Sequence, residues 1–325
     1  MDKVILAKEN GTDVSDMRTA YCDTLLELAE KDERIVALDA DLMGAMGMKP
    51  FAKRFPARTV DCGIQEANMI GVACGLAVWG KIPFAHTFGP FCTRRACDQI
   101  FMSGAYNKAN VKVVGSDPGI TAAYNGGTHM PFEDMGIMRG IPTMTVVEPT
   151  DIVMLKDLLP QIADTYGMFY MRLVRKEVRK VYDEGSHFTI GEAAHLRDGS
   201  DVTIIASGYC VAEALDAARA LQTQGVNARV LNMFTWKPLD EDAVLCAACE
   251  TGAIVTAENH NVINGLGSAV SELLAKCHPA PVEMVGVQDE FGEVGPVSYL
   301  RERFGLTGAD IAAAVRRALA RKQQS

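Results

Sequence analysis

The sequence lacks any excess of basic residues and any long apolar run. Lys and Arg total 32 against 41 Asp and Glu, which gives a formal net charge of −9 at pH 7. Nucleic acids and anionic membranes select for clustered basic residues, so we expect neither as a partner. No run reaches the roughly 18 apolar residues that span a bilayer, and the first residues lack the apolar core and cleavage site of a secretory signal. We therefore expect a soluble, cytoplasmic protein that acts on a small molecule or another protein.

A disulfide framework is also missing, although the chain has nine cysteines. Their number is odd and they are scattered through apolar segments, which is typical of a reducing compartment. Cys246 and Cys249 form a single CxxC without a second pair or a nearby histidine. We interpret this spacing as one face of a helix rather than as a zinc or redox site.

The chain is rich in apolar residues, which make up 48% of its 325 residues. This length exceeds the size at which a single core usually stops growing, so two domains are expected. Short β-branched runs alternate with longer helical patterns, which is typical of parallel βαβ units. We predict an α/β fold of two consecutive parallel-sheet domains, residues 1–180 and 201–325, joined by a polar linker over residues 181–200.

The pattern also predicts individual elements. In the first domain, strands are predicted at Ile35–Leu38, Ile82–His86, Val111–Val114, Thr143–Val147 and Phe169–Leu173. The helices between them are predicted at Arg18–Glu30, Gln65–Trp79, Cys92–Tyr106 and Ile152–Ala163. In the second domain, strands are predicted at Val202–Ile205, Ala228–Leu231, Ala253–Thr256 and Val282–Val285.

The segment Asp61–Trp79, DCGIQEANMIGVACGLAVW, is almost entirely apolar after Asn68, so we predict a helix that is buried on all sides. Glu66 is conspicuous at the entrance of such a helix. It has an ordinary explanation, because free N–H groups and the helix macrodipole stabilise acidic residues in a first turn. The pattern alone favours that explanation.

The neighbours of Glu66 change this interpretation. Gly63-Ile64-Gln65-Glu66, followed by Met69-Ile70 and Gly75-Leu76-Ala77, resembles the pyrimidine-domain motif of transketolases, which use thiamine diphosphate. The resemblance implies that Glu66 is catalytic and bonds the N1′ atom of the cofactor's aminopyrimidine. A carboxyl group in a dry site can share a proton with that ring, which activates the cofactor for attack on a ketose carbonyl. Glutamine would have the same shape but could not carry the proton.

A second match lies in the segment Pro83–Phe91, where a strand runs into an aromatic turn. The resemblance implies that Phe88 and Phe91 pack against the pyrimidine ring of the cofactor. Without it, two phenylalanines after a strand are ordinarily core residues. Arg94 stands where the family commonly has a further pocket tyrosine, which implies a changed pocket lining.

The glycine-rich loop Ser116–Glu133 follows a buried strand and is expected at the carboxyl edge of the sheet, where ligands bind in such folds. It is similar to the family's G-x-T-H-Q-x-x-E loop, with Met130 in place of the glutamine. The resemblance implies that His129 is catalytic and bonds the sugar oxygens and the charge that develops on them. A lone loop histidine is otherwise usually just exposed. Asn125 replaces the aspartate that contacts the donor's C2 hydroxyl, so the donor stereochemistry stays open.

Arg18 and Arg175 match family positions that bind a substrate phosphate. A guanidinium group can donate two parallel hydrogen bonds to such an oxyanion. Either residue could instead form an ordinary surface ion pair. The serine of the family's A-D-L-x-x-S element is replaced by Ala45, and the phosphate-binding histidine has no counterpart in Gly115–Asp117. We therefore expect a sugar phosphate substrate whose anionic end sits differently from that of a common pentulose phosphate.

One part of the family pattern is missing. Transketolases hold the diphosphate through Mg²⁺ with a G-D-G motif and a downstream asparagine, and this chain contains no G-D-G. The resemblance thus implies that an N-terminal transketolase subunit holds Mg²⁺ and the diphosphate, and that no residue here is a metal ligand. An α₂β₂ assembly built on a dimer of this chain is expected. The second domain resembles the transketolase C-terminal domain, with a structural role and no catalytic part for His260.

The predicted function is therefore a subunit of a transketolase of carbohydrate metabolism, which transfers a two-carbon ketol unit from a ketose phosphate to an aldose together with its partner. A β subunit of a 2-oxoacid dehydrogenase has the same size and domains but usually a different histidine-bearing loop. A 1-deoxyxylulose-phosphate synthase has a related loop but normally forms one long chain. A non-catalytic relative is a third alternative, against which the joint presence of Glu66, Phe88, Phe91 and His129 argues.

Overall fold

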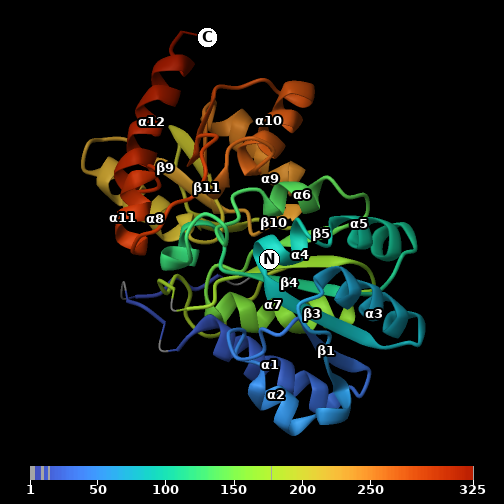
Figure 1. The fold of residues 1–325 in the computed structure, drawn as a ribbon. Coiled ribbons are helices and arrows are strands. Elements are labelled where there is room, and N and C mark those ends of the chain that lie inside the picture. Colours follow the sequence, from blue (N-terminus) through green and yellow to red (C-terminus); the bar gives the residue numbers. More distant parts are fainter. Residues whose placement is uncertain (1–3, 9–10, 14, 177, 325) are drawn as a thin grey trace.

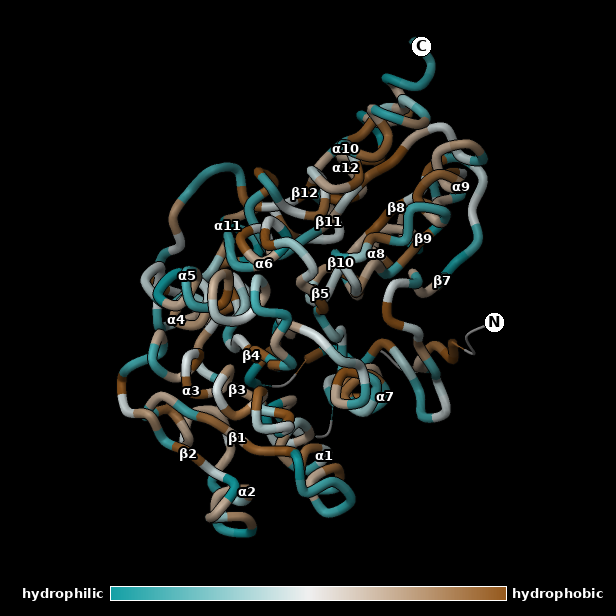
Figure 2. The backbone as a smooth tube through the Cα atoms, turned by 90° about the vertical axis from the view of Figure 1, so that its right-hand side faces the viewer, coloured by the Kyte–Doolittle hydropathy of each residue, from teal (hydrophilic) through white to brown (hydrophobic). Residues whose placement is uncertain are grey.

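The computed structural model describes residues 4–8, 11–13, 15–176 and 178–324. It contains two mostly parallel sheets, each covered by helices, which confirms the predicted α/β fold of two consecutive domains. Figure 1 shows the first domain, in blue to green, below the second, in yellow to red. Figure 2 shows that the apolar segments run mainly through the sheets, whereas the connections are largely hydrophilic.

The first sheet has seven strands in the order β10-β5-β6-β4-β3-β1-β2. Six are parallel and come from the first domain, namely β1 (Ile35–Asp39), β2 (Thr59–Asp61), β3 (Ile82–Phe88), β4 (Lys112–Ser116), β5 (Thr145–Val147) and β6 (Phe169–Leu173). All residues of β1, β3, β4 and β6 are buried, because helices cover both faces of the sheet. This explains why these strands are mainly apolar in sequence and show no regular alternation of apolar and polar residues.

Helices α1 (Met17–Lys31) and α7 (Ile152–Asp164) pack on one face of this sheet, with the short α2 (Lys49–Arg54) and η1 (Pro56–Arg58) near α1. Helices α3 (Glu66–Val78), α5 (Cys97–Gln99), η2 (Ile100–Tyr106) and α6 (Asp134–Arg139) pack on the other. The helix predicted over Cys92–Tyr106 is interrupted: α4 (Gly89–Thr93) ends before a turn at residues 94–96, and α5 continues into a π-helical turn. Apolar periodicity does not distinguish such breaks from one continuous helix.

The second sheet has the order β12-β11-β8-β9-β7. Strands β8 (Val202–Ala206), β9 (Ala228–Asn232), β11 (Ile254–Asn261) and β12 (Val282–Val287) are parallel, and β7 (Ala194–Arg197) is antiparallel to β9. Helices α8 (Cys210–Gln222) and α12 (Gly308–Lys322) cover one face, and α9 (Glu241–Thr251) and α10 (Leu266–Cys277) cover the other. Helix α11 (Val297–Arg303) precedes α12. Cys246 and Cys249 lie on α9 as free, exposed thiols, in agreement with the helical interpretation.

The two domains are interleaved along the chain. Strand β10 (Thr235–Lys237) belongs to the second half of the sequence but pairs antiparallel with β5 of the first sheet. The stretch 181–200, predicted as a linker, includes β7 of the second sheet, and Leu6 and Thr12 form β-bridges with Tyr182 and Arg179 near its start. None of the helices in the described residues is long and apolar enough to cross a membrane.

A fully buried ion-pair network lies at the junction of the domains. Arg172 on β6 forms a bidentate pair with Asp134, with both N–O distances 2.9 Å, and bonds Glu148 at 3.0 Å. The other oxygen of Glu148 accepts a bond from Ser207 of the second domain (2.7 Å), whose hydroxyl in turn accepts from Trp236 Nε1 (2.8 Å). Buried charges are tolerated when each is paired and hydrogen-bonded, as here, and the network therefore fixes how the two sheets meet.

The end of β11 holds the long loop after β4. Asn259 accepts a bond from Ile120 N–H (3.0 Å) and donates to the Pro118 carbonyl (3.0 Å). His260 Nε2 accepts from Gly136 N–H (3.2 Å), while its Nδ1 lies 2.7 Å from the Asn261 carbonyl, which fixes a neutral ring. Burial, together with the nearby Arg172 charge, lowers the pKa of His260 to about 4.

This neutral histidine makes stability depend on pH. Between about pH 4 and 6.5 the unfolded chain binds more protons at this residue than the folded chain, so stability falls as the pH is lowered through this window. We expect His260 to account for a loss of about 2 kcal/mol in unfolding free energy between about pH 7 and pH 5. Urea unfolding of His260→Gln should lack this part of the loss, whereas His278→Gln, at an exposed position, should keep it. An unchanged pH dependence in His260→Gln would contradict the assignment.

Candidate active site

The candidate residues come from strand ends that meet at one edge of the first sheet. Because β1 to β6 are parallel, their carboxyl ends share that edge. Glu66 follows β2, Phe88 ends β3, the loop with His129 follows β4 and Arg175 follows β6. Positions spread over more than one hundred residues of sequence are thus brought to one place.

Glu66 is the first residue of α3 and its side chain is buried, only 4% exposed. Its Oε1 accepts a hydrogen bond from Arg95 Nη1 at 2.9 Å. The prediction that α3 is buried on all sides is wrong for this chain. The residues that face the sheet are buried, but Gly71, Gly75, Val78 and Trp79 are exposed. Two sides of the helix are therefore apolar, and the rest of this chain covers only the side that faces the sheet.

Three aromatic rings form a cluster, and one of them, Phe91, contacts the Arg95 side chain that bonds Glu66. The centroids of Phe88 and Phe91 are 5.8 Å apart, and the His129 ring meets both edge-on, at 5.7 and 5.1 Å. Thr128 Oγ1 lies 2.8 Å from His129 Nδ1 and orients the imidazole. The structure therefore groups Phe88, Phe91 and His129, which the sequence placed in two separate segments.

Arg18 and Arg175, the two residues predicted to bind a substrate phosphate, lie on adjacent backbone segments. Arg18 N–H donates to the Arg175 carbonyl (3.4 Å), and Arg18 Nη1 donates to the Ala45 carbonyl (3.0 Å). Arg18 is also paired with Asp16, and Arg175 with the buried Asp117 at 3.1 Å. The Arg175 guanidinium lies 5.2 Å from the Phe88 centroid, which connects this basic pair to the aromatic cluster.

Asn125 contributes less than the other candidates. It ends the 3₁₀ segment η3 (Gly119–Asn125) and is exposed, and within the described part of the chain its side chain makes no hydrogen bond. A substrate could reach it, but the chain itself does not hold it in one orientation.

Arg94 and Arg95 occupy the turn between α4 and α5 and point to different partners. Arg94 pairs with Glu133 (3.2 Å) and donates to the Thr128 carbonyl (3.1 Å), so it holds the loop that carries His129. Burial raises the pKa of Glu133, although Arg94 opposes this. Arg95 was not among the predicted residues. Two consecutive arginines at a helix break usually indicate a surface, and no sequence signal pointed to its contact with Glu66.

The second domain supports the loop that carries His129. A Cβ atom at Gly127 would lie 2.3 Å from the Gly292 carbonyl, and one at Gly119 would lie 2.1 Å from Asn259 Oδ1. Both positions therefore require glycine, because the backbone of the loop touches the second domain directly. The C-terminal half of the chain thus positions a candidate catalytic residue.

The arrangement fits a planar heterocycle. The Arg95 guanidinium is itself planar, donates to Glu66 and lies 3.9 Å from the Phe91 centroid. A flat group with hydrogen-bonding nitrogens is therefore accommodated between the carboxylate and the ring. Glu66, Phe88 and Phe91 are the residues of this chain that could hold an aminopyrimidine, and the described residues contain no cluster of His, Cys, Asp and Glu suited to a metal ion.

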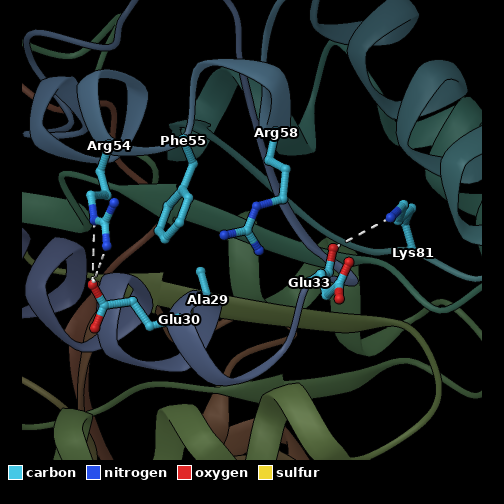
Figure 3. A pocket seen from close by; sticks show the side chains of 7 residues that line it. All are labelled: Ala29, Glu30, Glu33, Arg54, Phe55, Arg58 and Lys81. Carbon is cyan, nitrogen blue, oxygen red and sulfur yellow. Dashed lines mark hydrogen bonds and ion pairs between the residues drawn. The ribbon is translucent and has the colours of Figure 1, made fainter.

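A pocket of about 600 Å³ lies elsewhere, near the amino ends of β1 and β3 (Figure 3). Its cations are already engaged: Arg54 pairs with Glu30, Arg58 stacks on Phe55 at 3.8 Å, and Lys81 donates to the Glu33 carbonyl. It lies at the opposite edge of the sheet from Glu66 and is not part of the candidate site.

Comparison with known proteins identifies both halves of the chain. The family models of the transketolase pyrimidine-binding domain and the transketolase C-terminal domain match residues 13–180 and 191–311. The 6-deoxy-6-sulfo-D-fructose transketolase subunit SqwH of Clostridium sp. (strain MSTE9) is 55% identical over 306 residues, 94% of this chain and 95% of that protein. One of the apulose-4-phosphate transketolase subunits of Phocaeicola vulgatus is 39% identical over 276 residues, 84% of this chain and 88% of that protein. A solved split-gene transketolase, described as an inactive β4 tetramer, superposes with a TM-score of 0.87 at 42% identity, covering 94% of this chain and 99% of that one.

The contact at Gly127 gives a test of the loop support. Gly127→Ala should force the loop away from Gly292 and lower the unfolding free energy by about 1 to 3 kcal/mol, as overpacking usually does. Amide hydrogen exchange should show faster exchange over residues 119–133. Gly140→Ala is the matched control, since a Cβ there would make only ordinary contacts. Equal exchange and stability in the two variants would refute the proposed support.

Proposed function

This chain belongs to the transketolase family, and from that premise we propose that it is the pyrimidine-binding subunit of a split transketolase. With an N-terminal subunit that holds Mg²⁺ and the diphosphate, it transfers a two-carbon ketol unit from an anionic ketose to an aldose. Thiamine diphosphate supplies the chemistry of carbon–carbon bond cleavage when it is bound. The residues of this chain bind its pyrimidine ring and orient the sugar.

The observation that carries this proposal is the buried Glu66, which Arg95 connects to the ring cluster of Phe88, Phe91 and His129. A carboxyl group that is 4% exposed, at the carboxyl edge of a parallel sheet and near a cluster of tilted and edge-on rings, suits proton exchange with a ring nitrogen. His129 is oriented by Thr128 and reaches the same cluster, where it can donate to a sugar oxygen. Both roles need the geometry that the loop and α3 provide.

The proposed donor carries an anionic group that faces Arg18 and Arg175. Relatives are named for 6-deoxy-6-sulfo-D-fructose and for apulose 4-phosphate, so a sulfonated ketose and a ketose phosphate are the two donors to try first. Arg18 and Arg175 support an anionic sugar of either kind. We also propose that residues 181–200 connect the two domains, with β7 inside this stretch joined to the second sheet. The enzyme is proposed to work in the cytoplasm.

The exposed apolar side of α3 supports a partner subunit. Val78 and Trp79 are 84% and 88% exposed, and Cβ atoms at Gly71 and Gly75 would meet nothing within 4 Å. Phe101, Met102 and Tyr106 of the adjacent η2 extend this surface. This surface runs along the helix that begins at Glu66, and we propose that the N-terminal subunit docks on it within an α₂β₂ assembly.

Replacement of Glu66 tests the chemical role. In the reconstituted pair with Mg²⁺ and thiamine diphosphate, Glu66→Gln should reduce ketol transfer by about 100-fold or more, because the amide cannot carry a proton. Its melting temperature should stay close to that of the wild type. Glu184→Gln, on an exposed turn, should leave turnover unchanged. Normal turnover in Glu66→Gln would refute the role, and turnover only with 2-oxoacids would point to the dehydrogenase alternative.

Replacement of Trp79 tests the partner surface. Trp79→Glu should leave the chain folded, but its affinity for the N-terminal subunit should fall about tenfold or more, because a charge would be buried at the contact. Size-exclusion chromatography with light scattering on the mixed subunits measures this. Ile263→Glu, at an exposed apolar residue of the second domain, is the control. Loss of self-association with unchanged partner binding would show that a second copy covers this surface instead.

A further inference from the structure

Arg95 makes two contacts at once in the candidate site. Its Nη1 lies 2.9 Å from Glu66 Oε1, and its guanidinium carbon lies 3.9 Å from the centroid of the Phe91 ring. The first contact is a charged hydrogen bond to a buried carboxylate, and the second is a stacked cation–π contact. Together they place the guanidinium over the Phe91 ring with its Nη1 atom bonded to Glu66.

These are the two contacts that the proposed function assigns to the aminopyrimidine. That ring also needs the Glu66 carboxylate at one edge and a phenylalanine against its face. At 3.9 Å from Phe91, the guanidinium fills the layer in which a second planar group would stack. One carboxylate oxygen and one ring face cannot serve both groups in the same place.

The burial of the two partners indicates which of them can move. Glu66 sits at the start of α3 with 4% of its side chain exposed, whereas the Arg95 side chain is 49% exposed. Arg95 lies in the turn of residues 94–96 and can rotate into solvent without a change in the sheet. Glu66 cannot leave without disturbing the helix start.

We propose that Arg95 closes the pyrimidine site of the unloaded chain and leaves it when the cofactor binds. This inference rests on the proposed function. The closed state has a physical reason: a buried carboxylate without a partner is costly, and Arg95 keeps Glu66 paired until the heterocycle replaces it. The chain therefore exists in a closed and an open form, and the cofactor binds the open one.

The first test measures cofactor affinity. Thiamine diphosphate with Mg²⁺ is titrated calorimetrically into the complex of the chain with its N-terminal subunit, for the wild type and for Arg95→Met. Methionine keeps the apolar stem but cannot pair with Glu66. Removal of the competing closed form should lower the dissociation constant by about 3- to 10-fold. Arg34→Met, which removes an exposed charge at the opposite edge of the sheet, should not change it.

The second test uses the full chain without cofactor. Arg95→Met should lower the melting temperature because it leaves Glu66 unpaired, and the additional change Glu66→Gln should restore part of the loss, which defines a double-mutant cycle. Weaker or unchanged cofactor binding in Arg95→Met would overturn the proposal, since Arg95 would then hold Glu66 for the cofactor rather than compete with it. A wild-type complex that binds no thiamine diphosphate would instead overturn the proposed function, and the inference with it.

Discussion

The buried ion pairs around Arg172 are the constraint on which the rest of the structure depends. Arg172 joins β6, the start of α6 through Asp134 and the end of β5 through Glu148, and its Nη2 also donates to the Pro131 carbonyl at 3.0 Å. Ser207 and Trp236 extend the network into the second domain. A charge this deeply buried is stable only when all its partners are in place, so the sheet, the loop before α6 and the second domain must adopt one mutual arrangement.

That arrangement makes the second domain a support of the candidate site. The loop that carries His129 is held from one side by Arg94 and from the other by Asn259 and the backbone at Gly292. Glu66, by contrast, is held by α3 and by Arg95. His129 is therefore held by two elements, whereas Glu66 is covered by Arg95, which we propose leaves when the cofactor binds. The exposed surface of α3 continues from the Glu66 side, and this is where we propose that the N-terminal subunit docks.

Much of the fold was predictable because parallel strands covered on both faces read as short apolar runs, and β6 was predicted with its observed bounds. The short β10 was missed, since three residues that pair with a strand from the other domain carry no local signal. The family resemblance predicted the site residues Glu66, Phe88, Phe91 and His129. Sequence spacing alone favoured ordinary roles, namely a first-turn acid for Glu66 and core packing for the two phenylalanines. The contact of Arg95 with Glu66 could not be predicted, because it depends on a turn between α4 and α5 that helical periodicity does not reveal.

The central claim is that this chain holds only the pyrimidine end of a cofactor that a second polypeptide anchors by its diphosphate. Equilibrium dialysis of labelled thiamine diphosphate in the presence of Mg²⁺ tests it most directly, with each subunit alone and with the two mixed. The account predicts that the mixture retains the cofactor and that this chain alone does not. Retention by this chain alone, as tight as by the mixture, would contradict it.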